Sequence, residues 1–290
     1  MFDEKKFKKH LAVRKLKNKV NHLIFFISTV FGVLMLAVLI SQILFRGWDW
    51  IDWQFLTSFP SRFAARAGIK SALFGSLWLI MLTTPVAFVL GVGTAIYLEE
   101  YAKDNWFARL VKLNISNLAG VPSIVFGILG LALFVRGLGL GRSVLAGSLT
   151  MALLVLPIIV VAAQEAIQAV PSSINHAALA LGATRWQMIK TVTIPTALPG
   201  ILTGTILAVS RALGETAPLI MIGALSFVAF VPKGPMDGFT ALPIQIFNWT
   251  SRPQEEFQNV AAAGIIVLLV VLLAMNAVAI LLRNKYQKRF

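Results

Sequence analysis

Two charged residues, Arg211 and Glu215, lie inside an otherwise apolar run, Ala197–Ile222. A charge at the centre of a bilayer costs about 2.5 to 3.5 kcal/mol on insertion scales, so such residues need a partner or a function. Residues four positions apart share one helix face, so the two side chains can neutralise each other or reach a neighbouring helix. We interpret Arg211 as a contact for an anion during transport, with Glu215 holding or gating it. A structural ion pair that locks two helices is the alternative.

A ridge of small residues runs along the same predicted helix, about 100° around the axis from the charged pair. Small side chains at every fourth position let another helix approach closely. The charged pair is therefore expected beside a helix seam, where a water-filled path could run. The ridge consists of Gly200, Gly204, Ala208, Ala212 and Thr216.

A second stretch, Glu165–Pro195, separates two hydrophobic segments and is itself polar only in part. It is too apolar for a flexible tether, and Pro171, Gly182 and Pro195 interrupt it too often for a membrane crossing. We predict short helices outside the lipid, with the flanking prolines fixing where the exposed helix begins and ends. A helix held there is available to another protein, although an ordinary interfacial hairpin would have the same pattern.

The elements that position these residues are membrane helices. The chain has 290 residues, of which 58% are hydrophobic and 13% charged, and its mean hydropathy is +0.80. This composition is typical of an all-α polytopic membrane protein. Six segments have the roughly 20 mostly apolar residues that a crossing needs: Leu23–Phe45, Ser71–Leu98, Leu118–Val135, Val144–Gln164, Ala197–Ile222 and Val260–Leu282.

Charge distribution predicts the orientation of these crossings. Six crossings place both termini on one side, and 17 of the 26 Lys and Arg residues then share the side of the termini, against 8 opposite and Arg211 within a crossing. The positive-inside rule puts both termini in the cytoplasm. We therefore divide the chain into a basic cytoplasmic segment (1–22), a transmembrane domain (23–282) with its cytoplasmic loop (165–195), and a cytoplasmic tail (283–290).

The third predicted crossing is broken near its start by Gly120 and Pro122, with Gly127 one turn later. Such breaks are tolerated where neighbouring groups or a cavity satisfy the backbone, so this segment either lines a pathway or is kinked for packing. Between the last two crossings, the apolar stretch Phe239–Trp249 predicts interfacial or re-entrant helices on the outer side.

Several classes of activity find no support in the composition. The chain has no Cys and three scattered His, so no metal or cofactor is expected. It lacks the Gly-x-x-x-x-Gly-Lys-Ser/Thr loop of ATPases, and apart from Glu215 no His, Asp or Glu lies at membrane depth to support a membrane enzyme. Basic residues are gathered at the ends and in loops, which is a topology signal and not a nucleic-acid footprint. Energy for transport must then come from a partner or from an ion gradient.

The stretch from His176 to Pro195 resembles the EAA loop of bacterial ABC-importer permeases. The family pattern is Glu-Ala-Ala, three residues, Gly, nine residues, Ile-x-Leu-Pro, and it matches in register at Ala177, Ala178, Gly182 and Pro195. His176 stands where the family has Glu, which removes any salt bridge of that Glu and the residue that would complete a capping box with Ser173.

Further blocks are similar to the A-type permeases of phosphate ABC importers, the PstA-like family. They are AIYLEEYA (95–102), NLAGVPSIVFG (117–127), LALGATRWQ (179–187), RALGETAP (211–218) and ALPIQIF (241–247). They extend from the second crossing onward and leave the basic N-terminal segment unmatched.

The resemblance implies a type I importer permease of the bacterial inner membrane, with no enzyme activity of its own. Its partners would be a similar C-type permease, two ATPase subunits gripping the loop at Ala177, Ala178, Gly182, Trp186 and Pro195, and an extracytoplasmic phosphate-binding protein. Arg211 would contact phosphate, with Ser123, Thr205 and Thr216 as possible hydrogen-bond donors. One arginine is too little for a tight site, so selectivity would lie mainly in the binding protein. Import of another oxyanion and ion-gradient-driven secondary transport are the alternatives.

Overall fold

The computed structural model describes residues 4–102, 105–224 and 227–286 and is almost entirely helical. Within these residues no strand forms, apart from one isolated bridge between Ser143 and Gly238. The first three residues, Lys103 and the predicted tail beyond Tyr286 lie outside the described residues. The principal helices are α1 (Glu4–Gly47), α3 (Lys70–Ile96), α4 (Trp106–Leu118), α5 (Ser123–Gly130), α6 (Val144–Gln168), α9 (Ile194–Gly214) and α12 (Glu256–Tyr286).

The remaining elements connect them. These are η1 (Trp48–Trp50), α2 (Trp53–Thr57), η2 (Ala64–Arg66), η3 (Tyr97–Tyr101), η4 (Leu131–Gly137), α7 (Ser172–Ala180), α8 (Arg185–Met188), η5 (Ile189–Thr193), α10 (Ala217–Met221) and α11 (Leu242–Thr250). The elements η3, η4 and η5 are π-helical and extend the helices beside them.

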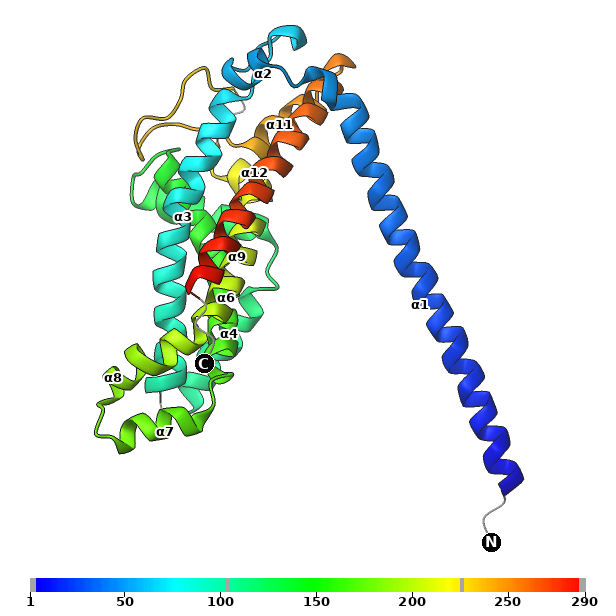
Figure 1. Ribbon diagram of the computed structural model, residues 1–290. Coiled ribbons are helices and arrows are strands. Elements are labelled where there is room, and N and C mark those ends of the chain that lie inside the picture. The colour runs from blue at the N-terminus through cyan, green and yellow to red at the C-terminus, as the bar shows by residue number, and fades with distance from the viewer. Residues whose placement is uncertain (1–3, 103–104, 225–226, 287–290) are drawn as a thin grey trace.

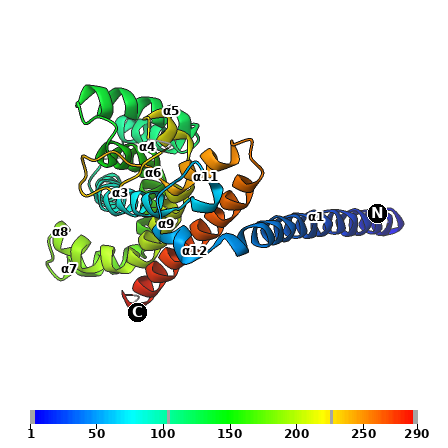
Figure 2. The same ribbon diagram turned by 90° about the horizontal axis from the view of Figure 1, so that it is seen from above.

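Helix α1 stands away from the rest of the molecule as a long arm (Figure 1). It joins the basic N-terminal segment and the first predicted crossing into one continuous helix, and its apolar side chains, such as Phe25 and Phe31, are largely exposed. At its C-terminal end Gly47 packs against the backbone of Ala262 and Ala263 in α12. Viewed from above, the arm still projects away from the body (Figure 2).

The body is organised around α6, the most deeply buried of the candidate spans, which packs against α3 and α9. The largest core includes Met151, Val155 and Ile159 of α6 together with apolar side chains of α3, α9 and α10. Helix α6 is apolar on nearly every side, as expected for a helix at the centre of a bundle. A second core, which includes Phe55, Trp249 and Phe257, joins α2, α11 and α12.

Five described helices are long and apolar enough to cross a membrane, and a sixth crossing results if α4 and the α5–η4 helix count as one bent span. The bend between them is 106° and lies at residues 119–122, where the sequence has Gly120 and Pro122. Pro122 has an extended ψ of 135° and immediately precedes α5, so it separates the two helices. The predicted third crossing therefore includes the break and α5–η4, while α4 precedes it.

Candidate functional site

Arg211 and Glu215 lie where the predicted fifth crossing is interrupted. The structure differs from the prediction here, because α9 ends at Gly214, Glu215 has an extended backbone (φ −76°, ψ 126°), and α10 begins at Ala217. The pair is nevertheless formed, with 3.3 Å between Arg211 Nε and Glu215 Oε1. The Arg211 side chain is 52% exposed and that of Glu215 is 17% exposed. The Arg211 guanidinium therefore lies near the end of α9 in an exposed position, and the more buried Glu215 carboxylate binds it from the side of the protein interior.

The small-residue ridge of α9 packs against α6 of the same chain. A Cβ on Gly204 would stand 2.2 Å from the Cβ of Ala162, and one on Gly200 would stand 2.8 Å from the Cβ of Ala166. Such an approach is possible only because these α9 positions carry no side chain. The predicted seam is thus internal to this subunit, and Arg211 lies around the helix from it.

Two of the three predicted donors lie on the elements that surround the break. Thr216 directly precedes α10 and is partly buried, and Ser123 is the first residue of α5. Helices α5 and α10 are in close contact, since a Cβ on Gly127 would stand 2.6 Å from the Cα of Pro218. Thr205 is buried in the middle of α9, and it donates to the carbonyl of Ile201, one turn earlier in the same helix.

The loop between α6 and α9 forms two short helices at the end of the body opposite α2 (Figure 1). Ala177 and Ala178 lie in α7, and Gly182 turns the chain with a φ of +88°, a conformation that favours glycine. Trp186 projects from α8 with 56% exposure, and Leu181 at the turn is 90% exposed. Exposed apolar side chains at the tip of a helical hairpin are typical of a protein contact.

Pro195 does not end the exposed helix as predicted. The chain from Arg185 to Gly214 is one continuous helical stretch, in which η5 directly precedes Ile194 and Pro195. A π-turn changes the hydrogen-bond register and so accommodates a proline that would otherwise clash with the preceding turn. Pro171 does precede the start of α7, whereas Gly182 marks the turn after it. A capping box forms at Thr184 and Gln187 of α8, not at Ser173.

Sequence reasoning assigned no role to Glu99, which lies within the AIYLEEYA block (95–102). The Glu99 carboxylate accepts hydrogen bonds from Gln164 Nε2 at 2.7 Å and Gln168 Nε2 at 2.9 Å, and it pairs with Lys112 Nζ at 2.7 Å. These partners are 13 to 69 positions away in the chain, so a single sequence offers no spacing signal for them. An acidic pair ending an apolar helix was the only visible hint.

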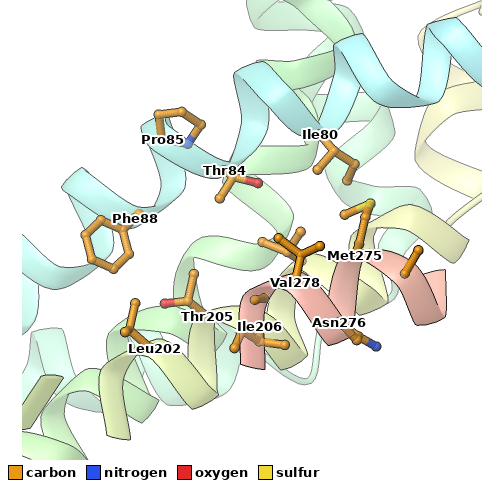
Figure 3. A pocket seen from close by; sticks show the side chains of 13 residues that line it. Ile80, Thr84, Pro85, Phe88, Leu202, Thr205, Ile206, Met275, Asn276 and Val278 are labelled. Atoms are coloured by element: carbon orange, nitrogen blue, oxygen red, sulfur yellow. The ribbon is translucent and has the colours of Figure 1, made fainter. Parts of the chain in front are cut away.

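A cavity of about 660 Å³ opens between α3, α9 and α12. Figure 3 shows side chains of α3, such as Phe88, facing those of α9 and α12 across it. Its lining is mostly apolar and contains no cationic residue. Thr84 Oγ1 is buried there without a hydrogen-bond partner, and Asn276 accepts from Ser210. Such a lining does not compensate an anion for its lost water, so this cavity is not a phosphate site.

The bundle of crossings, the break beside Arg211 and the exposed α7–α8 hairpin together define a membrane permease subunit. The chain belongs to the family of binding-protein-dependent transport system inner membrane components, whose model matches residues 87–289. It is therefore a multi-pass protein of the inner membrane, in a family of transport subunits and not of enzymes. The resemblance predicted from the motifs is confirmed.

Individual relatives extend over almost the whole chain. It is 32% identical over 278 residues to the probable ABC transporter permease protein YqgI of Bacillus subtilis, covering 92% of this chain and 95% of that protein. It is 31% identical over 277 residues to the phosphate transport system permease protein PstA of Yersinia pestis, covering 94% and 92%.

A solved structure agrees with the fold. A chain of a bacterial alginate ABC transporter in complex with an alginate pentasaccharide-bound periplasmic protein matches with a TM-score of 0.65 and 15% identity, covering 91% of this chain and 93% of that one. The predicted class, an all-α polytopic importer permease, is confirmed.

Proposed function

We propose that this subunit moves inorganic phosphate into the cytoplasm as part of an ATP-driven importer. The observation that carries the proposal is the 31% identity to a phosphate transport permease over 94% of the chain. Similarity of this extent includes the break at Arg211, the α7–α8 hairpin and the α4–α5 bend, and is not confined to one motif. The proposed cargo is a tetrahedral oxyanion, for which an arginine is the best-suited side chain.

The importer would contain three further kinds of protein. A second, C-type permease would pair with this chain, an ATPase dimer would supply energy, and an extracytoplasmic binding protein would deliver phosphate. The orientation that fits puts both termini and the α7–α8 hairpin in the cytoplasm, as the count of basic residues favours. The exposed Leu181 and Trp186, with Ala177, Ala178 and Gly182 shaping the hairpin, would form the surface that the ATPase grips.

Arg211 would serve as a transient anion contact. Its guanidinium is half exposed at a helix end, so phosphate can reach it without disrupting a helix. Glu215 holds one side of the guanidinium and leaves its other donors available to a ligand. Thr216 and Ser123 would add hydroxyl donors from α10 and α5. A lone cation half neutralised by Glu215 binds weakly, which suits a pathway through which the ion must pass.

The test is uptake of labelled phosphate in cells that express the whole importer, with variants compared at equal membrane levels. Arg211→Gln removes the charge while keeping a polar side chain, and we expect the initial rate to fall about tenfold or more, because charge-assisted hydrogen bonds to the anion are lost. Arg211→Lys should retain part of the rate, since it keeps the charge without the planar fork. Arg62→Gln, at an exposed arginine beside Phe63, is the matched control.

Full uptake by Arg211→Gln would remove Arg211 from the transport path. Labelled sulfate provides the test of cargo: uptake of sulfate with no uptake of phosphate would replace phosphate by another oxyanion. Uptake that persists without any ATPase subunit would instead favour an ion-gradient-driven transporter.

A further inference from the structure

The carboxylate of Glu99 joins three helical elements at one point. Glu99 lies in η3, at the end of α3, and its side chain is only 11% exposed. Oε1 accepts from Gln164 and pairs with Lys112, both at 2.7 Å, while Oε2 accepts from Gln168 at 2.9 Å. We call these four residues the Glu99 clamp; it connects η3 to both α4 and α6.

The clamp leads directly into the α7–α8 hairpin, and η3 has a second contact with the hairpin itself. Gln168 is the last residue of α6, and α7 begins four residues later at Ser172. Within the hairpin, the guanidinium of Arg185, the first residue of α8, lies over the Tyr101 ring of η3, at 5.6 Å from its centroid. Element η3 is thus held by the end of the helix that leads into the hairpin and by a residue of the hairpin itself.

Lys112 extends the connection toward the break at Arg211. It lies on α4, which is followed by the 106° bend and then by α5. Helix α5 packs on α10 through Gly127 and Pro218, and α10 begins two residues after Glu215. A continuous set of packed elements therefore leads from the hairpin through Glu99 and Lys112 to the proposed anion contact.

We infer that the Glu99 clamp is a positioning device that makes α4 and α5 follow the α7–α8 hairpin, and so couples ATP hydrolysis to opening of the path. The inference rests on the proposed binding of the ATPase to this hairpin. A carboxylate suits the role because it accepts several charge-assisted hydrogen bonds at once, which fixes the relative orientation of its partners. Rigid-body switches of packed helices need such fixed junctions to pass on a displacement.

The clamp is tested in the complete importer, reconstituted in proteoliposomes with its second permease, ATPase and binding protein. Two quantities are measured: the phosphate imported per ATP hydrolysed, and the stimulation of ATP hydrolysis by the binding protein. Glu99→Gln should lower both by about two- to thirtyfold, the range for mutations that alter coupling between sites. Basal ATP hydrolysis and complex assembly should be retained. Glu165→Gln, at an exposed carboxylate of α6 outside the clamp, is the matched control.

The exchanged pair Glu99→Lys with Lys112→Glu tests the interaction itself. The amides of Gln164 and Gln168 can turn their oxygens toward an ammonium, so the exchange should recover part of the coupling that each single variant loses. Unchanged coupling in Glu99→Gln, or the same loss in Glu165→Gln, would overturn the inference. Loss of assembly together with all ATP hydrolysis would also overturn it, because the clamp would then be only a folding contact.

Other results would show that the proposed function is wrong, and they can be distinguished from failure of the clamp. Leu181→Asp should release the ATPase while leaving the clamp intact, and retention of the ATPase would contradict the proposed docking surface. If the wild-type importer responds to its binding protein but imports no phosphate, the cargo is wrong. The clamp is then judged by the stimulation of ATP hydrolysis alone.

Discussion

The contact between α9 and α6 at Gly204 makes a quantitative prediction. Replacing Gly204 by Ala would place a Cβ 2.2 Å from the Cβ of Ala162. Non-bonded carbons need about 3.5 to 4.0 Å, so the helices must separate by roughly 1.5 Å. Both atoms are attached directly to a backbone, so no side-chain rotation relieves the clash. Overpacking of this kind costs about 1 to 3 kcal/mol.

The helix propensity of alanine partly masks this cost, and a control separates the two effects. Gly93→Ala in α3 adds the same methyl group where nothing lies within 4 Å, so it reports the propensity gain of about 1 kcal/mol alone. Relative to that control, Gly204→Ala should lower the ratio of folded to unfolded protein about 5- to 150-fold. Reversible unfolding of the purified chain in mixed micelles, followed by tryptophan fluorescence, measures the ratio.

Ala162→Gly combined with Gly204→Ala should restore the contact. The methyl group then moves from one helix to the other, so the double variant should be more stable than the sum of the two single changes predicts. Equal stability of Gly204→Ala and Gly93→Ala would refute the proposed helix contact. Additive effects in the double variant would do the same.

Two further predictions concern the hairpin and the last helix. Gly182 has a φ of +88° with open space around it, so Gly182→Val should strain the α7–α8 turn by about 1 to 2 kcal/mol and speed its limited proteolysis, while Gly182→Asn should do so less. Ser210 Oγ of α9 shares its proton between Asn276 Oδ1 of α12, at 2.5 Å, and the carbonyl oxygen of Ile206 in its own helix, at 2.7 Å. Asn276→Leu should therefore lower the unfolding free energy by about 0.6 to 1.7 kcal/mol in the micelle assay, and Ser210→Ala should add almost nothing to it; additivity of the two changes would contradict the hydrogen bond.

Hydropathy predicts where the membrane helices lie but is insensitive to breaks within them. The run Ala197–Ile222 is apolar throughout, so it reads as one crossing, yet α9 ends at Gly214 and α10 starts at Ala217. The signal for this break was present, because a glycine followed within four residues by Pro218 is a common pattern at helix ends. The break at Gly120 and Pro122 was recognised from the same residue types.

Other features depend on contacts that a single sequence does not reveal. Pro195 predicted a helix end, but the π-turn of η5 absorbs it, and no local pattern announces such a turn. The ridge on α9 was predicted to face a helix, and its spacing is correct, but only the fold identifies α6 as that helix. Glu99 shows the limit most clearly, since its partners lie on α4 and α6 and their identities follow from packing alone.

The hydroxyl groups of the α1 arm bear on how the importer assembles. Ser28, Thr29 and Ser41 each donate to the carbonyl four residues earlier in α1, so none offers its proton to another helix. A neighbour that lies along this arm would meet mainly its exposed leucine, valine and phenylalanine side chains, with the amide of Gln42 as a remaining hydrogen-bond donor. Packing of another helix against the arm would then depend mainly on the fit of apolar side chains.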